Sequence, residues 1–289
     1  MRIRLGDFSH YAARPIALAQ RYATTAKPER APRISIVTPV YNQRSYIEAC
    51  IQSVLSQQYP NLQYIVMDGG STDGTWQVIQ RFLDSLSHAH SGPDGGQAAA
   101  INAGMRLTDG EILAWLNGDD LLLPGSLNYI ARFFEDHSEV DAIYGHRLVI
   151  NEDGLETGRW VLPPHDGAVL SWIDFIPQET LFVRRSAFEK VGFALDESFR
   201  FALDWDLLLR LRDAGVRFSR LPRYLGAFRV HPEQKTSAAW EQMGVVETAR
   251  LLERCHGRVP TLLERRLRVF PYVARHQVLS WVDSVFGCY

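Results

Sequence analysis

Residues 33–75 read RISIVTPVYNQRSYIEACIQSVLSQQYPNLQYIVMDGGSTDGT, and they set the architecture of the chain. Residues 34–38 and 62–67 are apolar runs of strand length. The segment between them has apolar residues at helical spacing, with Ser45 and Glu48 placed as a capping box. A strand, a helix and a second strand in this order predict a parallel β-α-β unit.

The alternation continues beyond this unit. Residues 98–105 have helical spacing, residues 111–116 form a further apolar strand, and a helix is expected to begin near Pro124. The turn at residues 151–154 predicts a hairpin, and residues 238–289 read as helices. We therefore predict an α/β fold with a mostly parallel, Rossmann-like sheet flanked by helices, a mixed α+β second half and a C-terminal helical appendage.

These patterns divide the 289 residues into three parts. Residues 1–32 form a lead-in, residues 33–235 form the patterned domain, and residues 236–289 form the appendage. Within the domain, residues 33–120 carry the strict alternation and residues 121–235 depart from it.

Composition limits the class of protein. Apolar residues make up 46% of the chain and charged residues 22%, which is typical of globular proteins and excludes disorder. The longest apolar run spans residues 112–116, so we expect no membrane span, and the N-terminus lacks the pattern of a secretory signal. Three scattered cysteines, Cys50, Cys255 and Cys288, fit neither a disulfide framework nor a zinc site, which favours the cytoplasm.

Charge is unevenly distributed along the chain. The net charge of −2 argues against nucleic-acid binding, yet residues 1–33 carry +5 and residues 250–289 carry +4. Basic ends on an acidic body suit peripheral contact with the anionic inner face of a membrane, although solvated arginines on helices explain them equally well.

Each of the three expected parallel strands runs into a polar segment. These segments are residues 38–42, 68–75 and 117–120. In an open parallel sheet, ligands bind beyond the carboxyl ends of the strands, so the three segments should converge on one site. Asp119 and Asp120 are adjacent carboxylates that repel each other unless a cation intervenes, and such a pair predicts Mg²⁺ or Mn²⁺ with a diphosphate ligand. The plainer alternative makes Asp120 a helix cap and Asp119 a solvated side chain.

Four segments in order, RISIVTPVYN (33–42), DGGSTDGT (68–75), GGQAAAINAG (95–104) and LNGDD (116–120), resemble those of a family 2 glycosyltransferase of the GT-A fold. The resemblance covers about residues 33–235. It implies an inverting enzyme that transfers a sugar from a nucleotide diphosphate sugar and uses a divalent metal.

The resemblance also assigns the nucleotide site. Pro39, Tyr41 and Asn42 would lie along the nucleotide, and Asp68 would accept the N3–H of a pyrimidine base. A carboxylate is only an acceptor, so Asp68 favours UDP or dTDP sugars without excluding GDP. Asp94 would lie near the nucleotide or serve as a turn residue.

The family's metal motif is often Asp-x-Asp, and here its first position is Asn117, which keeps a side chain able to bond the ribose. The resemblance makes Asp119 the expected metal ligand, with Asp120 as its partner. His231, in the segment RVHPEQKT (229–236), would reach the metal or the diphosphate.

The segment FALDWDLLLR (201–210) matches the family element that carries the general base. The match is Asp204, with Leu203 where the family usually has Glu. A base is needed because inversion requires a group opposite the leaving group to take the proton of the attacking hydroxyl. The other reading of Asp204 is a helix N-cap.

Other functions remain as alternatives. The departures at Asn117 and Leu203 favour a non-catalytic nucleotide-sugar binder, whereas the retained acidic residues favour an enzyme. A sugar-phosphate nucleotidyltransferase would need a Gly-rich phosphate loop, which we do not find. Processive synthases carry a Gln-x-x-Arg-Trp motif and membrane spans, and we find neither in this sequence. We therefore expect transfer of a single sugar to a glycan or lipid-linked acceptor, in bacterial surface polysaccharide synthesis.

Overall fold

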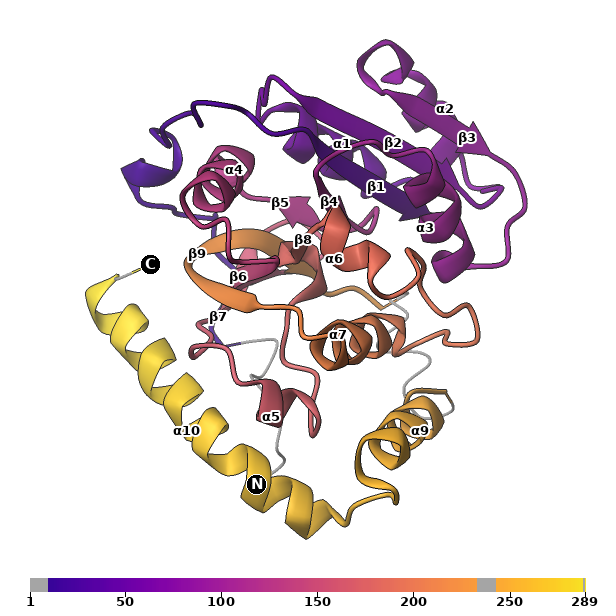
Figure 1. Cartoon of the computed structure of the whole chain (residues 1–289). Helices are drawn as coiled ribbons and strands as arrows, with labels where there is room; N and C mark the ends of the chain where they lie inside the picture. The colour runs from indigo at the N-terminus through magenta and orange to yellow at the C-terminus, as the bar shows by residue number, and fades with distance from the viewer. Residues whose placement is uncertain (1–9, 233–242, 288) are drawn as a thin grey trace.

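A computed structural model describes residues 10–232, 243–287 and 289 (Figure 1). Within these residues one sheet runs in the order β3-β2-β1-β4-β8-β6-β9-β5, and β7 pairs with β6. The strands are β1 (Ile34–Val40), β2 (Leu62–Asp68), β3 (His88–Ser91), β4 (Ile112–Trp115), β5 (Leu121–Leu122), β6 (Ala142–Ile150), β7 (Glu156–Trp160), β8 (Phe182–Arg184) and β9 (Phe218–Arg229). The helices are α1 (Ile47–Leu55), α2 (Thr75–Gln80), α3 (Gln97–Arg106), α4 (Ser126–Asp136), α5 (Gly167–Leu170), α6 (Arg185–Glu189), α7 (Leu203–Asp213), α9 (Val245–His256) and α10 (Leu262–Phe286), with short turns η1 (Gln20–Tyr22), η2 (Leu83–Ser85) and η3 (Gln178–Thr180).

Helices cover both faces of the first half of the sheet. Strands β1 to β4 are parallel to their neighbours here, with β1 between β2 and β4. Side chains alternate along a strand, so Ile34 and Ile36 of β1 pack with α1, while Val37 packs with α3. This confirms the predicted parallel α/β layer.

The second half is mixed, as expected. Strand β8 is antiparallel to β4 and β6, whereas β6 and β9 pair in parallel. The predicted hairpin is confirmed, because β6 and β7 pair antiparallel around the turn at residues 151–154. Residues 218–229 form the single long strand β9.

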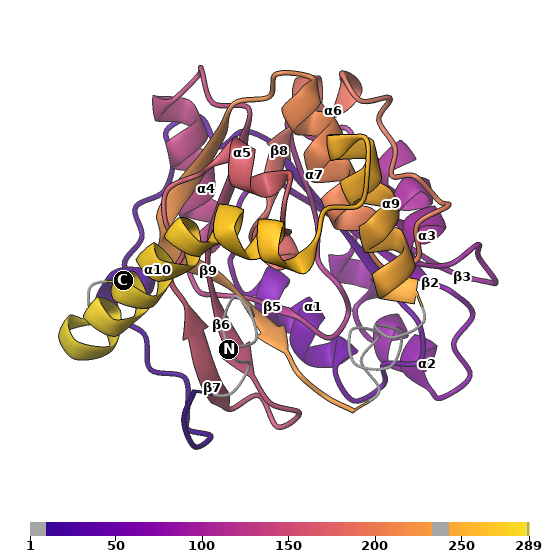
Figure 2. The ribbon, with the colours of Figure 1, turned by 90° about the horizontal axis from the view of Figure 1, so that it is seen from below.

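The C-terminal helices lie along the second half of the molecule. Helix α10 runs beside β7 and α5, on the side away from α1 and α2 (Figures 1 and 2). It begins with a capping box in which the Thr261 hydroxyl and the Glu264 carboxylate bond each other's backbone N–H groups. The expected boundary between domain and appendage, at residues 235 and 236, lies outside the described residues.

Local signals misplaced some element ends. The capping box expected at Ser45 is wrong, because α1 begins at Ile47 and its N-cap Tyr46 makes no side-chain cap. The helix expected near Pro124 begins at Ser126, after Gly125 in the left-handed conformation with φ of 71°. Strand β3 was not expected at all.

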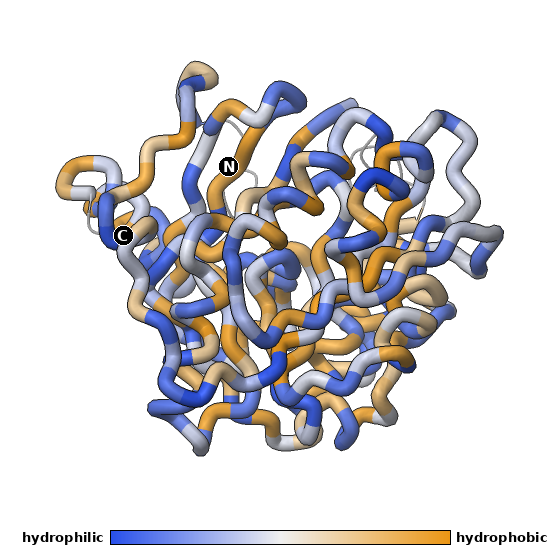
Figure 3. Tube along the Cα trace, turned by 90° about the horizontal axis from the view of Figure 1, so that it is seen from above, coloured by the Kyte–Doolittle hydropathy of each residue, from blue (hydrophilic) through white to orange (hydrophobic). Residues whose placement is uncertain are grey.

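Hydrophobic segments cross the middle of the molecule, and many hydrophilic turns lie at its rim (Figure 3). In the parts of the chain that the structure describes, no helix combines the length and the apolarity that crossing a membrane demands.

Candidate active site

The three polar segments lie at one edge of the sheet. In the parallel register Val40 of β1 is opposite Asp68 of β2, and Val37 is opposite Trp115 of β4. The strands therefore end at similar heights, and the loops that follow them meet. This is the convergence that the sequence predicts.

The loop after β1 is tied to the loop after β2. Asn42 has a φ of 51°, its side-chain oxygen accepts from Thr72 N at 2.9 Å, and its own N–H donates to Ser71 Oγ at 2.8 Å. Pro39 is buried in β1, while Tyr41 is 61% exposed. Of the residues expected along the nucleotide, Tyr41 thus presents an open aromatic surface.

Asp68 ends β2 and is buried. Its carboxylate accepts from the hydroxyls of Ser71 and Ser91 and from Ser71 N at 3.2 Å. Asp94 lies close by, since a Cβ at Gly69 would come within 2.9 Å of its Oδ2. The structure therefore brings both expected base-side carboxylates to the end of β2, and Gly69 leaves room for the second.

Asn117 sits between the two halves of the sheet. Its side-chain oxygen accepts from Gln97 at 2.8 Å, and its amide nitrogen lies 3.2 Å from Gln178 Oε1 and 3.4 Å from Asp120 Oδ2. An amide can donate to both of these oxygens, whereas a carboxylate would repel Asp120. The Asn117 amide thus joins a residue of α3 to a residue of η3.

Asp119 and His231 meet although 112 residues separate them in the sequence. His231 Nε2 lies 3.1 Å from Asp119 Oδ2, and both residues are buried. The Tyr46 ring lies 4.6 Å from the imidazole, and Arg229 Nε donates to the Asp119 carbonyl at 2.8 Å. Among the described residues His231 Nδ1 is buried without a hydrogen-bond partner. A carboxylate oxygen and an imidazole nitrogen are thus held together at this edge of the sheet.

Asp120 has other partners. Its Oδ1 accepts from the backbone N–H of Arg229 at 3.0 Å. Burial, with the nearby carboxylates of Asp119 and Glu179, raises the pKa of Asp120 well above its ordinary value. The described residues contain no group of three or more His, Cys, Asp or Glu side chains arranged to hold a metal ion. The structure therefore pairs two of the three expected ligands and binds Asp120 to β9.

A buried ion pair that sequence analysis missed lies behind this edge. Arg147 Nε donates to Glu179 Oε1 at 2.8 Å, and a second bond joins the same two groups. The guanidinium lies 4.4 Å from the Phe228 ring centroid and 5.0 Å from that of Trp160. The positive charge of Arg147 favours the ionised form of both Asp120 and Asp174. The ion pair therefore influences both of these buried carboxyl groups.

Asp204 lies in the first turn of α7, partly buried. The N-cap is Ala202, so the alternative reading of Asp204 as the N-cap is wrong. Burial and the Asp204 carboxylate raise the pKa of Asp174 well above its ordinary value. The Asp174 and Asp204 carboxyls therefore interact, and the charge of Asp204 disfavours ionisation of Asp174.

Helix α9 fixes the start of α7. The Glu247 carboxylate accepts from the backbone N–H groups of Arg200, Phe201 and Ala202, each at 2.8 Å. These donors precede the helix and would otherwise lack intrahelical partners. Glu247 is 46 residues from Phe201, so no local spacing could have indicated it.

Comparison with known proteins agrees with this architecture. The family described as Glycosyl transferase family 2 matches residues 35–192, which is more than half of the chain. A curated relative, an uncharacterized glycosyltransferase of Rickettsia typhi, is 29% identical over 224 residues, covering 73% of this chain and 68% of the relative.

Two solved structures have the same fold. TarS of S. aureus, residues 1–349 in complex with UDP-GlcNAc, superposes with a TM-score of 0.64 at 18% identity, covering 88% of this chain and 76% of that one. The mannosyltransferase PcManGT of Pyrobaculum calidifontis, in complex with GDP-Man and Mn²⁺, gives 0.60 at 20% identity, covering 94% and 72%. The expected GT-A architecture is confirmed, and the protein belongs to glycosyl transferase family 2.

Proposed function

We propose that this glycosyltransferase moves a single sugar from a nucleotide diphosphate sugar to a hydroxyl of a glycan or lipid-linked acceptor, with inversion, in the synthesis of bacterial surface polysaccharide. The observation that carries the proposal is the pairing of Asp119 with His231, 3.1 Å apart, at the edge where the β1 and β2 loops also end. In this proposal the nucleobase, the diphosphate and the cation would bind side by side along that edge.

We propose Asp68 as the base-recognition residue, with UDP or dTDP as the favoured nucleotide. Its carboxylate is held by hydroxyls of Ser71 and Ser91, which can rotate toward other acceptors when a base arrives. A carboxylate accepts the imide N–H of uracil or thymine, and UDP-GlcNAc is the ligand of TarS. Pro39, Tyr41, Asn42, Asp94 and Asn117 complete the proposed nucleotide surface.

We propose Asp119 and His231 as the metal ligands. Mg²⁺ and Mn²⁺ accept carboxylate oxygen, and imidazole also suits Mn²⁺; such ions are commonly held by one or two protein groups plus substrate phosphates. The residues fit this arrangement, and Mn²⁺ is present in the PcManGT complex. When bound, the cation supplies charge neutralisation for the departing diphosphate. Asp120, the expected partner of Asp119, stays the weaker of the two proposed carboxylate ligands, because its Oδ1 accepts from the Arg229 N–H.

We propose Asp204 as the general base. A carboxylate at this position can accept the proton of the acceptor hydroxyl, and the neighbouring Asp174, whose pKa is raised by burial and by the Asp204 charge, does not compete for that role. As that proton transfers, the hydroxyl oxygen forms the new bond to the anomeric carbon, and the bond to the diphosphate breaks on the opposite face. Glu247 keeps the first turn of α7 in place for this transfer.

Isothermal titration with UDP, dTDP and GDP in the presence of Mn²⁺ tests the donor assignment. We expect one pyrimidine nucleotide to bind best, with Asp68→Asn weakening it about ten-fold or more because the amide turns a donor toward the base N–H. Asp84→Asn is the matched control, at an exposed carboxylate of η2 outside the proposed nucleotide surface. Equal binding of all three nucleotides, or no effect of Asp68→Asn, would refute the assignment.

A further inference from the structure

Helix α10 exposes an apolar stripe to solvent. Eight of the fifteen exposed large hydrophobic side chains in the described residues belong to this one helix. Six of them recur at helical spacing and are 54% to 67% exposed: Leu263, Leu267, Phe270, Val278, Trp281 and Val285. With Ala274 they follow the spacing of one helix face over about 33 Å. Exposed apolar side chains that gather on one face of a helix mark an interaction surface.

The opposite face of α10 is fixed to the protein. Val269, Tyr272 and His276 are buried, and His276 Nδ1 lies 2.8 Å from the Val161 carbonyl oxygen. Near the end of the helix, Asp283 accepts from the Tyr224 hydroxyl at 2.6 Å. The helix therefore lies flat along the body of the molecule, with its stripe turned outward (Figures 1 and 2).

Arginines border the stripe on both sides. On a helical projection Arg266 falls on one side, and Arg268 and Arg275 fall on the other; all three are exposed. The helix has two acidic residues, and both are engaged: Glu264 in the capping box and with Arg258, and Asp283 in the core. The outward surface of α10 is therefore apolar at its centre and positive at its borders.

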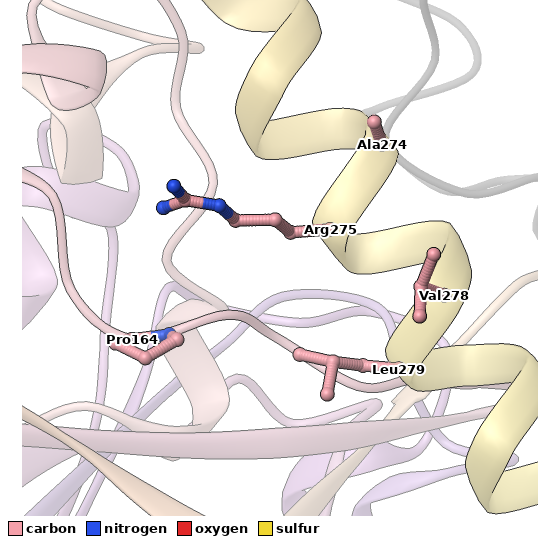
Figure 4. Close-up of a pocket in the computed structure, with 5 residues that line it drawn as sticks. All are labelled: Pro164, Ala274, Arg275, Val278 and Leu279. Atoms are coloured by element: carbon pink, nitrogen blue, oxygen red, sulfur yellow. The ribbon is translucent and has the colours of Figure 1, made fainter.

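A shallow apolar cavity adjoins the stripe. It has a volume of about 410 Å³ and lies between Pro164 and the α10 side chains Ala274, Arg275, Val278 and Leu279 (Figure 4). Its exposed lining is almost entirely apolar, with the Arg275 guanidinium beside it. Hydrocarbon against Val278 and an anionic group against Arg275 would satisfy both parts of this surface.

We propose that α10 is an in-plane docking surface for an anionic lipid membrane. An apolar face bearing Trp, Phe and Leu with basic flanks matches helices that insert about 5–10 Å into the headgroup region. Charge selects this occupant over a second copy of the chain, because both carboxylates of residues 262–286 already have partners, Glu264 with Arg258 and Asp283 with the Tyr224 hydroxyl, and neither is free to pair with the arginines of another α10. Anionic headgroups supply that charge along the whole stripe.

Co-sedimentation with vesicles tests the proposal. We expect the full chain to bind phosphatidylcholine vesicles that contain a third phosphatidylglycerol, and to bind pure phosphatidylcholine much more weakly. Leu267→Gln, Phe270→Gln and Trp281→Gln together should weaken binding about ten-fold or more, since each removes apolar area from the bilayer contact. Arg266→Gln with Arg268→Gln should weaken it and reduce its salt dependence. Leu83→Gln with Leu107→Gln, at exposed positions of the first half, is the matched control and should change nothing.

Three results would overturn the proposal: no binding to anionic vesicles, binding that the triple variant leaves unchanged, or a vesicle-free dimer in light scattering that the triple variant dissociates. Because the substituted side chains are exposed, the variants should retain the wild-type fold, which circular dichroism and UDP titration on the same samples would verify. The UDP titration also separates this proposal from the donor assignment, since either can fail while the other holds.

Discussion

The first half of the sheet builds its share of the site from near neighbours in sequence, and the second half builds its share from distant ones. Asn42 bonds Thr72, 30 residues away, and Asp68 bonds Ser91, 23 residues away. His231 instead meets Asp119 across 112 residues, and Arg229 meets Asp120 across 109. The loops proposed to bind the nucleotide are thus encoded by successive β-α units, whereas the residues proposed to bind the metal depend on contacts across the whole domain.

The largest effect expected from this comparison is at the proposed base in the second half. Asp204→Asn should lower turnover by about 10²- to 10⁴-fold, because the amide cannot take the hydroxyl proton. Affinity for UDP should stay at the wild-type value, since the nucleotide loops belong to the first half. The steady-state rate of UDP release measures turnover, and calorimetric titration measures UDP affinity. Unchanged turnover would remove Asp204 from the mechanism.

The next effect concerns stability. Glu179→Gln should lower the free energy of unfolding by about 3–5 kcal/mol, because it leaves the Arg147 charge buried without a partner. The matched control is Glu111→Gln, which removes the exposed pair with Arg30 and should cost at most about 1 kcal/mol. Denaturant unfolding measures the free energy of unfolding of both variants. Similar losses would mean that the Arg147 guanidinium finds another partner in Glu179→Gln.

A third prediction separates two adjacent carboxylates. Asp119→Asn should weaken Mn²⁺-dependent UDP binding by at least about 10- to 100-fold, the range seen even for groups that only support metal ligands. Asp120→Asn keeps an oxygen that can accept from Arg229 N and should weaken it less. Titration of both variants with UDP in the presence of Mn²⁺ shows which substitution weakens binding more. A larger loss in Asp120→Asn than in Asp119→Asn would make Asp120 the ligand.

A smaller effect is expected where the C-terminal helices hold α7. In Glu247→Gln the side-chain amide oxygen can still accept from the N–H groups before α7. The loss of the negative charge weakens these hydrogen bonds by about 1 kcal/mol. Turnover should fall about five-fold while UDP affinity is unchanged, and Glu247→Asp should restore part of the loss. A fall in both quantities would indicate a general loss of structure.

The smallest effect is a dependence of stability on pH that arises in the second half and α10. Burial lowers the pKa of His165 to about 4, and burial also lowers the pKa values of His146 and His276. Because the unfolded chain binds these protons near pH 6.5, this stability is present above pH 6.5 and is lost as pH falls toward 4.

At pH 5, the partly exposed His165 should account for about 1 kcal/mol of the loss in folding free energy. Calorimetric melting of wild type and His165→Gln from pH 7 to pH 5 measures it. A variant whose pH slope equals that of wild type would contradict the assignment.

The same contrast explains what sequence reasoning could predict. Apolar periodicity and turn residues are local, so β1, α1, β2 and the three loops were expected in their observed order. Strand β3 was missed because its sequence HAHS has no apolar run and lies exposed at the sheet edge. The partner of Asp120 was not predictable, because the Arg229 N–H lies 109 residues away in sequence and is brought near Asp120 by the pairing of β9 with β5. Glu247 and the Arg147–Glu179 pair likewise acquire their roles from tertiary contacts.

We propose that the two halves of the domain meet in one metal and diphosphate site. UDP titration of wild type and His231→Gln, each with and without Mn²⁺, tests it most directly, because His231 is the ligand that the second half supplies. The account predicts that Mn²⁺ strengthens UDP binding to wild type and that His231→Gln loses about ten-fold or more of this gain. UDP binding that is independent of Mn²⁺, or a full Mn²⁺ response in His231→Gln, would contradict it.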